Sequence, residues 1–207
     1  MEADWSADIA PGLPEIIVPW SSNESDKTLT WRDLRLAGPH LDAAIQSIPS
    51  AAAEPALAEA LRTLHAPNSP WFTSKCDLWT TNPADSDPPD PYEFEAADLV
   101  TDTTTYAAPL HLCASYIDIL PANTGLFQSF PAQENLLNAL TTTLRTQPQP
   151  HARIDLVVRA ARTHGVPGFA FTAYAAGCGL TADDAHRSWQ QALARLTHAL
   201  QAAALPG

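Results

Sequence analysis

Residues 152–189 read ARIDLVVRAARTHGVPGFAFTAYAAGCGLTADDAHRSW, and this stretch decides the fold. Residues 153–161 and 168–176 alternate between apolar and polar side chains, which is the period of a β-strand. The turn between them contains glycines and a proline, as expected of a hairpin. Thr181 and Asp184 are spaced as the cap and first turn of a helix. The apolar side chains that follow have a helical period: Trp189, Leu193, Leu196 and Leu200. The stretch therefore predicts two strands followed by a helix.

The same order of elements occurs earlier in the chain. Residues 72–81 and 110–120 also alternate, and Pro131 stands where it can occupy the first turn of a helix over 131–144. From residue 70 onward the order is therefore ββα-ββα. This order predicts an α+β fold with a four-stranded, mainly antiparallel sheet and helices on one face. A circularly permuted ferredoxin-like sandwich would have this order.

The chain before residue 70 has a different character. Its beginning is rich in acids, proline and serine, with one short apolar run at 16–18 that is suited to an edge strand. Two amphipathic helical patterns follow, at 41–48 and 57–64. The predicted parts are an irregular acidic arm over 1–28, a helical extension packed on the main body over 29–69, and an α+β sandwich over 70–207 with a long acidic loop at 82–109.

Charge is unevenly distributed along the 207 residues. The formal charge is −12, from 23 Asp and Glu against 11 Lys and Arg. Thirteen of the acids fall in 1–26 and 82–102, which contain no base, so the remaining chain has ten acids against eleven bases. Binding to phosphate groups requires clustered Lys and Arg. We therefore expect neither nucleic acid nor a membrane surface as a partner.

The N-terminus has no basic region followed by an apolar stretch, which argues against a secretory signal. The longest charge-free run, 165–182, contains four glycines and Pro167 and does not predict a membrane-spanning helix. The three cysteines lie far apart without a Cys-x-x-Cys pair. These features predict a cytoplasmic protein with reduced thiols.

Three predicted strands carry an aspartate between two apolar residues: Asp77, Asp118 and Asp155. Strand geometry places the apolar neighbours on the helix-packed face and each aspartate on the opposite face. By the same alternation, Phe72 is expected on the helix-packed face. Further polar and aromatic side chains are expected on the aspartate face: Lys75, Trp79, Tyr116, Arg153, Arg159, Thr172 and Tyr174. The register of the strands, which decides whether the aspartates are level, does not follow from the sequence.

Three interpretations of this face remain open. It can be a solvated sheet face, on which cross-strand Asp–Arg pairs contribute about 0.2–1 kcal/mol each. The aspartates can instead converge to bind a cation or a polar ligand, or to supply a general base. The face can also be a protein-binding or dimer surface, since tyrosine, tryptophan and arginine are enriched at such surfaces.

The expected function is a non-catalytic binding module for a small polar ligand or a protein partner, which uses the polar–aromatic sheet face. One alternative is a small enzyme with Asp77 or Asp118 as general base, in which Arg153, Arg159 or Tyr174 stabilises charge. Another is an acidic inhibitor or immunity-type protein for a basic partner. A water-restricted aspartate with a raised pKa favours the enzyme, whereas aspartates paired with arginines favour the binding module.

The segment Gly177-Cys-Gly-Leu-Thr-Ala182 matches the G-x-G-x-x-A pattern of dinucleotide-binding turns. Only 25 residues follow it, which leaves no room for a second parallel strand with a ribose-binding acid. Asp183 and Asp184 also stand where a phosphate would bind. We therefore predict a tight strand-to-helix turn and no nucleotide cofactor. Cys178 lacks a histidine adjacent in sequence that would activate a nucleophile.

No pattern predicts a metal site or a cofactor. Asp85, Asp87 and Asp90 resemble the start of a calcium loop but lack its glycine turn and closing glutamate. Asp183 and His186 have ligand-like helical spacing without a second pair. The acidic segment is therefore interpreted as a solvated loop.

Overall fold

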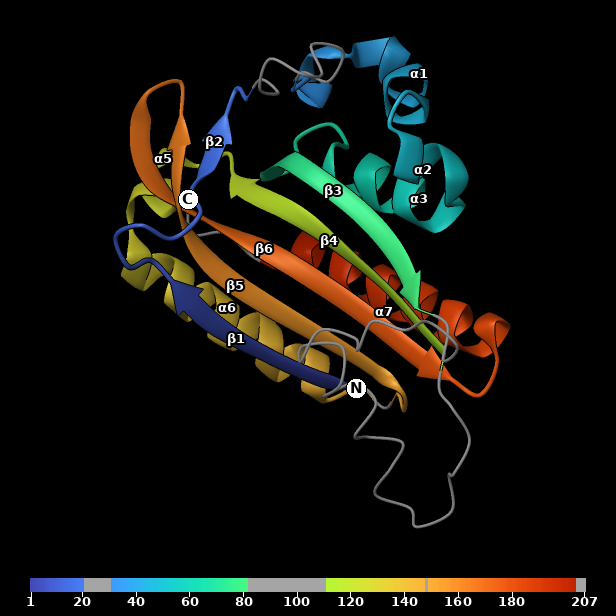
Figure 1. The fold of residues 1–207 in the computed structure, drawn as a ribbon. Helices are drawn as coiled ribbons and strands as arrows, with labels where there is room; N and C mark the ends of the chain where they lie inside the picture. Colours follow the sequence, from blue (N-terminus) through green and yellow to red (C-terminus); the bar gives the residue numbers. More distant parts are fainter. Residues whose placement is uncertain (21–30, 82–110, 148, 204–207) are drawn as a thin grey trace.

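The computed structural model describes residues 1–20, 31–81, 111–147 and 149–203. Its centre is a mixed α+β arrangement, in which helices lie behind one face of a twisted sheet (Figure 1). The strands in the described residues are β1 (Glu2–Asp8), β2 (Ile16–Val18), β3 (Trp71–Thr81), β4 (His111–Pro121), β5 (Ala152–Thr163) and β6 (Val166–Gly179). The α-helices there are α1 (Leu41–Gln46), α2 (Pro49–Ala53), α3 (Pro55–Leu64), α5 (Thr124–Gln128), α6 (Phe130–Arg145) and α7 (Ala182–Ala202).

The sheet has the strand order β1-β5-β6-β4-β3, and β2 also pairs with β5. The four strands β3, β4, β6 and β5 pair antiparallel with their neighbours. They correspond to the four strands expected from the alternating pattern. Both β1 and β2 pair in parallel with β5, which makes the sheet mixed and six-stranded in the described residues. The expected four-stranded ferredoxin-like sheet is therefore not matched exactly.

The expectation of an irregular arm is wrong for residues Glu2–Asp8, which form the edge strand β1. Its side chains do alternate, since Ala3 and Trp5 pack with the main core and the acidic residues lie on the other face. The Trp5 indole nitrogen donates a hydrogen bond to Asn138 Oδ1 on α6 at 2.7 Å. The run at 16–18 forms the expected short strand, β2.

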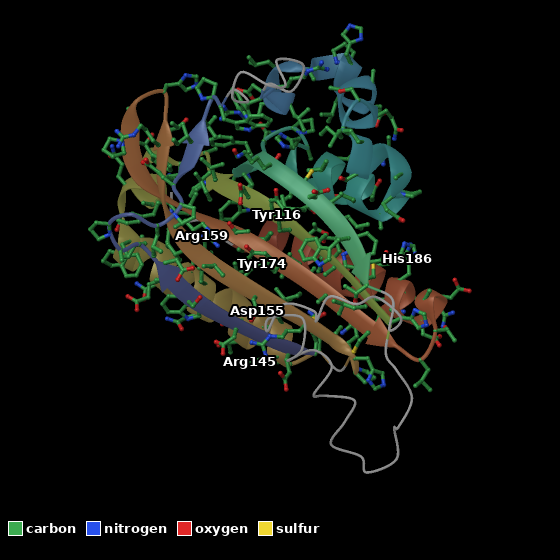
Figure 2. All side chains as sticks on the ribbon, in the orientation of Figure 1. Tyr116, Arg145, Asp155, Arg159, Tyr174 and His186 are labelled. Atoms are coloured by element: carbon green, nitrogen blue, oxygen red, sulfur yellow. The ribbon has the colours of Figure 1, made fainter. Side chains whose placement is uncertain are left out.

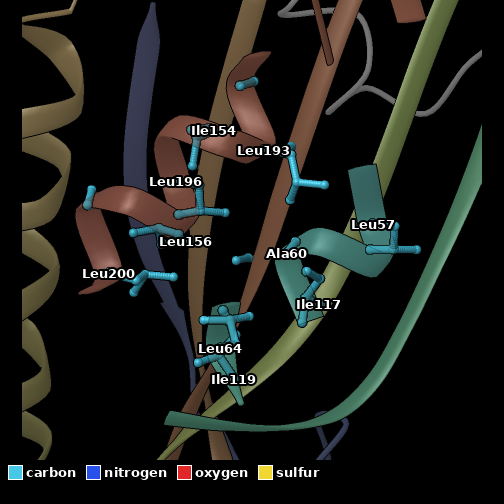
Figure 3. Close-up of a cluster of buried hydrophobic side chains, with 14 of the residues drawn as sticks. Leu57, Ala60, Leu64, Ile117, Ile119, Ile154, Leu156, Leu193, Leu196 and Leu200 are labelled. Carbon is cyan, nitrogen blue, oxygen red and sulfur yellow. The ribbon is translucent and has the colours of Figure 1, made fainter. Parts of the chain in front are cut away.

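The helices α6 and α7 lie side by side in one layer, which covers the rear face of the sheet in the view of Figure 1. Helix α7 packs mainly on β6 and β4, α6 runs along β1, and α3 packs against α7. In the core, leucines of α3 and α7 meet aliphatic side chains of β4 and β5 (Figure 3). Buried Trp189 donates its indole hydrogen to Ser115 Oγ at 2.8 Å, which ties α7 to β4. The N-terminal helices thus extend the helical layer through α3.

A bulge between Thr73 and Cys76 interrupts the alternation of β3. The expectation that Phe72 lies on the helix-packed face is therefore wrong. Phe72 instead packs in a second small cluster with Leu120 and Val18, while Cys76 packs against the main core. Each bulge carbonyl accepts an indole hydrogen bond: Thr73 O from Trp31 at 3.2 Å and Ser74 O from Trp20 at 3.1 Å.

The turn from β6 to α7 depends on close packing at two glycines. A Cβ atom at Gly177 would overlap the backbone nitrogen of Trp189, and one at Gly179 would crowd Asp184. Thr181 caps α7 by accepting a hydrogen bond from the Asp184 backbone N–H at 3.1 Å. The tight strand-to-helix turn expected from the sequence is confirmed. In the described residues, no helix has the length and apolar character that crossing a membrane requires.

Candidate functional site

The open face is the sheet face turned away from α6 and α7. Backbone register sets four side chains level across it, in the order Asp155, Tyr174, Tyr116 and Asp77. Figure 2 shows Asp155, Tyr174 and Tyr116 along this line. Three strand spacings of about 4.8 Å separate the backbones of Asp155 and Asp77 by roughly 14 Å. The aspartates therefore share the open face without converging.

Asp118 lies in the next row and is joined to β6 and β5 by hydrogen bonds. Thr172 Oγ1 donates to Asp118 Oδ1 at 2.7 Å, and Arg159 Nε donates to Thr172 Oγ1 at 3.1 Å. Arg159 Nη2 also lies 3.4 Å from Tyr174 Oη. We call Asp118, Thr172, Arg159, Tyr174 and Tyr116 the Asp118 cluster. Alternate residues of the neighbouring antiparallel strands β4, β6 and β5 place it near the centre of the open face.

Asp118 is a carboxyl group withdrawn from water. It is only 8% exposed, and no ion pair to it is present in the described part of the chain. Burial raises its pKa above the ordinary value, while the Thr172 hydrogen bond and the charges of Lys75 and Arg159 limit the rise. Among the described residues, an ionised carboxylate here is stabilised by one hydroxyl donor, Thr172, and by the more distant charges of Lys75 and Arg159, which compensate incompletely for lost hydration.

Aromatic rings lie beside this carboxyl group. The ring centres of Trp79 and Tyr116 are 6.4 Å apart, and those of Tyr116 and Tyr174 are 6.2 Å apart. Burial, followed by the charge of Asp118, raises the pKa of Tyr116 to about 12. Its hydroxyl group therefore stays protonated at neutral pH and can donate a hydrogen bond. The three half-buried rings supply apolar surface that reaches across β3, β4 and β6.

The arginines nearer the sheet edge have carboxylate partners. Arg153 makes two hydrogen bonds to Asp155, at 2.7 and 2.8 Å, and also lies 3.2 Å from Glu2. Arg159 Nη1 is 3.8 Å from Asp8. Glu2 and Asp8 lie on β1, so the sequence-based expectation omitted them when it treated residues 1–28 as irregular. The alternation of acidic and apolar residues over 2–8 was the available signal.

Asp77 lies at the opposite edge of the open face and is exposed. It accepts hydrogen bonds from Ser50 Oγ at 2.5 Å and from the Leu78 backbone N–H at 2.9 Å. Lys75 is also exposed, with Nζ 5.1 Å from the centre of the Trp20 ring. Asp77 is therefore better suited to anchoring α2 on β3 than to proton transfer in a water-restricted site.

The cysteines are thiols, and burial raises the pKa of Cys76 and Cys113 to about 12 and that of Cys178 to about 11. Such thiols are protonated at neutral pH and are poor nucleophiles. Across the described ranges, no three His, Cys, Asp or Glu side chains form a group that could hold a metal ion. His186 instead contacts Glu54 at 2.8 Å. The calcium-like segment at 85–90 lies outside the described residues.

The candidate residues thus fall into three groups on one face. Asp118, Tyr116, Tyr174 and Arg159 come together around Thr172, which the sequence placed on this face but did not select as a site residue. Arg153 and Asp155 pair with each other, and Asp77 and Trp79 lie towards the β3 edge. Comparisons with protein-family models, with curated proteins and with solved structures found no match to this chain.

Proposed function

We propose that the protein is a binding module for a small polar ligand, which it holds at the Asp118 cluster. The carrying observation is that the open face pairs Asp155 with Arg153 and joins Asp118 through Thr172 to Arg159, because engagement with arginines favours a binding module. Asp118 itself is buried, with one hydroxyl donor among the described residues. A buried carboxyl group with so little compensation lowers the stability of the folded protein. Perturbed titratable groups of this kind concentrate at functional sites.

The cluster favours a ligand with three chemical features. A hydroxyl or amino group would donate to the Asp118 carboxylate, and an acceptor atom would face the Arg159 guanidinium, whose side chain is 17% exposed. A ring or an aliphatic portion would contact Tyr116 and Tyr174. A protein partner is less favoured, because Arg153, Asp155 and Arg159 are only 14–17% exposed and are engaged within the chain.

The proposal is tested with glucose, ethanolamine and acetate as probes of the neutral hydroxyl, amino and anionic classes. We expect glucose or ethanolamine to shift the NMR signals of the Tyr116 and Tyr174 rings, and acetate to leave them unchanged. Asp118→Asn should weaken that binding roughly 10- to 100-fold, because it removes a charge-assisted hydrogen bond. Asp183→Asn, an exposed acid on α7, is the matched control. Shifts produced by acetate alone, or equal effects of both variants, would contradict the proposal.

A small enzyme with Asp118 as general base is the second candidate, and the raised pKa of this aspartate favours it. A bound probe should then be converted, which NMR of the probe itself would detect. In that case Asp118→Asn should abolish conversion while a ligand contact through Tyr174 persists. Recovery of the bound probe unchanged after long incubation would support the binding module.

The geometry supports an acidic inhibitor less well than it supports a binding module. The four acids within residues 1–20 each lie near an arginine of the same chain, in the pairs Glu2–Arg153, Asp4–Arg145, Asp8–Arg159 and Glu15–Arg162. Their charges are therefore partly neutralised before any basic partner approaches.

We further propose a cytoplasmic location, on the basis of the three reduced cysteines, and a ligand other than nucleic acid.

A further inference from the structure

Among the described strands, β1 and β3 form the two edges of the sheet. The backbone N–H and C=O groups on the outer side of an edge strand face no neighbouring strand, so such an edge can pair with another chain. β1 pairs with β5 along all seven of its residues, which leaves an outer edge of the same length. Asp4, Ser6 and Ala7 are exposed along this strand. The β1 edge therefore has the length and the accessibility that addition of a strand requires.

Side chains already bond to the outward-facing backbone groups in the first half of β1. The Ala3 carbonyl oxygen accepts a hydrogen bond from Arg145 Nε at 2.6 Å. The Trp5 backbone N–H donates to Asp4 Oδ1 at 2.8 Å. Ala3 and Trp5 are two residues apart in a strand, so their backbone groups point to the same side. This is the outer side, because side chains engage both groups and β5 lies on the other side.

Arg145 reaches the β1 edge from the last turn of α6, in the helical layer behind the sheet. Figure 2 shows it at the outer margin of β1. Its Nη2 atom donates to Asp4 Oδ1 at 3.2 Å, so one carboxylate oxygen accepts both from the guanidinium and from the Trp5 N–H. The two side chains are 54% and 60% exposed, and an exposed ion pair contributes little to stability. Their hydrogen bonds to the backbone indicate a role at the edge itself.

The outer side of β3 has the same kind of hydrogen bonds. The Thr73 carbonyl oxygen accepts from the Trp31 indole at 3.2 Å. The next carbonyl oxygen, that of Ser74, accepts from the Trp20 indole at 3.1 Å. The Leu78 backbone N–H donates to the carboxylate of the residue before it at 2.9 Å, as in β1. The recurrence of these bonds at both edges of the sheet points to a common role.

We propose that Asp4 and Arg145 close the β1 edge to strand addition, so that two copies of this chain do not pair through β1. An incoming strand needs the Ala3 carbonyl group as an acceptor and the Trp5 N–H as a donor, and both groups are already bonded. Charged side chains at an edge are a known means of preventing such pairing. This inference concerns the edge of the sheet and is independent of the ligand proposed for the Asp118 cluster.

The test compares the self-association of wild type and Asp4→Ala/Arg145→Ala by sedimentation velocity over a wide range of protein concentrations. The double substitution removes one acid and one base, so the formal charge stays at −12. We expect the double variant to self-associate roughly tenfold more tightly than wild type, or tighter still, because the freed groups can bond to a second β1. Asp42→Ala/Arg62→Ala removes an exposed pair between α1 and α3 and should associate as wild type does. A double variant at the β1 edge that associates no more than wild type would overturn the proposal, and so would equal association of the two double variants.

Two single variants separate hydrogen bonding from charge and keep the proposal testable if the double variant fails to fold. Asp4→Asn keeps an acceptor for the Trp5 N–H and should behave as wild type, whereas Asp4→Ala should associate. Hydrogen exchange of the Trp5 amide should be faster in dilute Asp4→Ala than in wild type, and slow again when that variant associates at high concentration. Equal association of the two single variants would overturn the proposal. Association without renewed protection of the Trp5 amide would also overturn it, because the interface would then lie elsewhere.

Discussion

At the scale of single residues, Asp118 links the fold to the proposed function. Its carboxyl group is buried against Thr172, and its pKa is raised chiefly by loss of hydration. A carboxyl group with a raised folded-state pKa stabilises the folded state at low pH. That contribution is lost as the pH rises through the folded-state pKa. At neutral pH, the wild-type protein therefore carries a local free-energy cost.

The first prediction concerns the stability of Asp118→Asn. The amide retains an acceptor for Thr172 Oγ1 and carries no charge, so the variant should be more stable than wild type at pH 7. We expect a gain of up to about 1 kcal/mol, or a few degrees in the temperature of thermal unfolding. The gain should shrink as the pH is lowered towards the ordinary aspartate pKa, because wild-type Asp118 is then protonated too. A gain that grows on acidification would contradict this account.

The second prediction concerns His65, which is buried and lies 2.9 Å from Thr73 Oγ1 through its Nε2 atom. Burial lowers its pKa from 6.5 to about 4. The unfolded chain therefore binds the proton more readily, so stability should fall as the pH drops from about 6.5 towards 4. His65→Gln should show a shallower loss in urea unfolding measured across this pH window. His198→Gln, at an exposed position on α7, should retain the wild-type slope. An unchanged slope in His65→Gln would refute the assignment.

At the scale of secondary structure, alternation predicted β3, β4, β5 and β6, because each of these strands has one face packed against helices. It failed at two places for different reasons. The bulge in β3 turns Phe72 to the opposite face, and its carbonyls are satisfied by tryptophans far away in sequence. In β1, the density of acidic residues hid an alternation whose acidic side chains lie beside the arginines of β5. The bulge in β3 and the strand β1 both depend on partners that lie far away in the sequence, and the alternation of neighbouring residues does not reveal such partners.

The third prediction concerns the contact between β6 and α7. Gly177→Ala would place a Cβ atom on the backbone of α7 near Trp189, so the helix would have to move away from the sheet. We expect a loss of about 3 kcal/mol in the free energy of unfolding, at the upper end for overpacked sites. In Gly125→Ala the new Cβ atom meets only the Asn123 side chain at 3.2 Å, and the change should be about 1 kcal/mol or less. Chemical denaturation of the two variants measures the difference, and equal stabilities would show that the close approach is unimportant.

At the scale of the whole molecule, the formal charge of −12 gives little guidance to the site. The acids described in the N-terminal segment pair with arginines around the edge of the sheet. Exposed pairs of this kind contribute about 0–1 kcal/mol each, so they orient β1 more than they stabilise it. The sequence predicted the polar and aromatic side chains around Asp118 on the open face but placed Phe72 on the wrong face. It could not predict which of them meet, because the register of β3, β4, β5 and β6 decides that.

The central claim is that the Asp118 cluster binds a polar ligand through the Asp118 carboxylate. Its most direct test is an NMR pH titration of the Asp118 carboxyl carbon, alone and with whichever of glucose or ethanolamine binds more tightly. We predict that Asp118 alone titrates above the ordinary aspartate range and that the bound probe lowers its pKa, because a ligand donor favours the charged form. An ordinary pKa in the protein alone, or a titration curve that no probe changes, would contradict the claim.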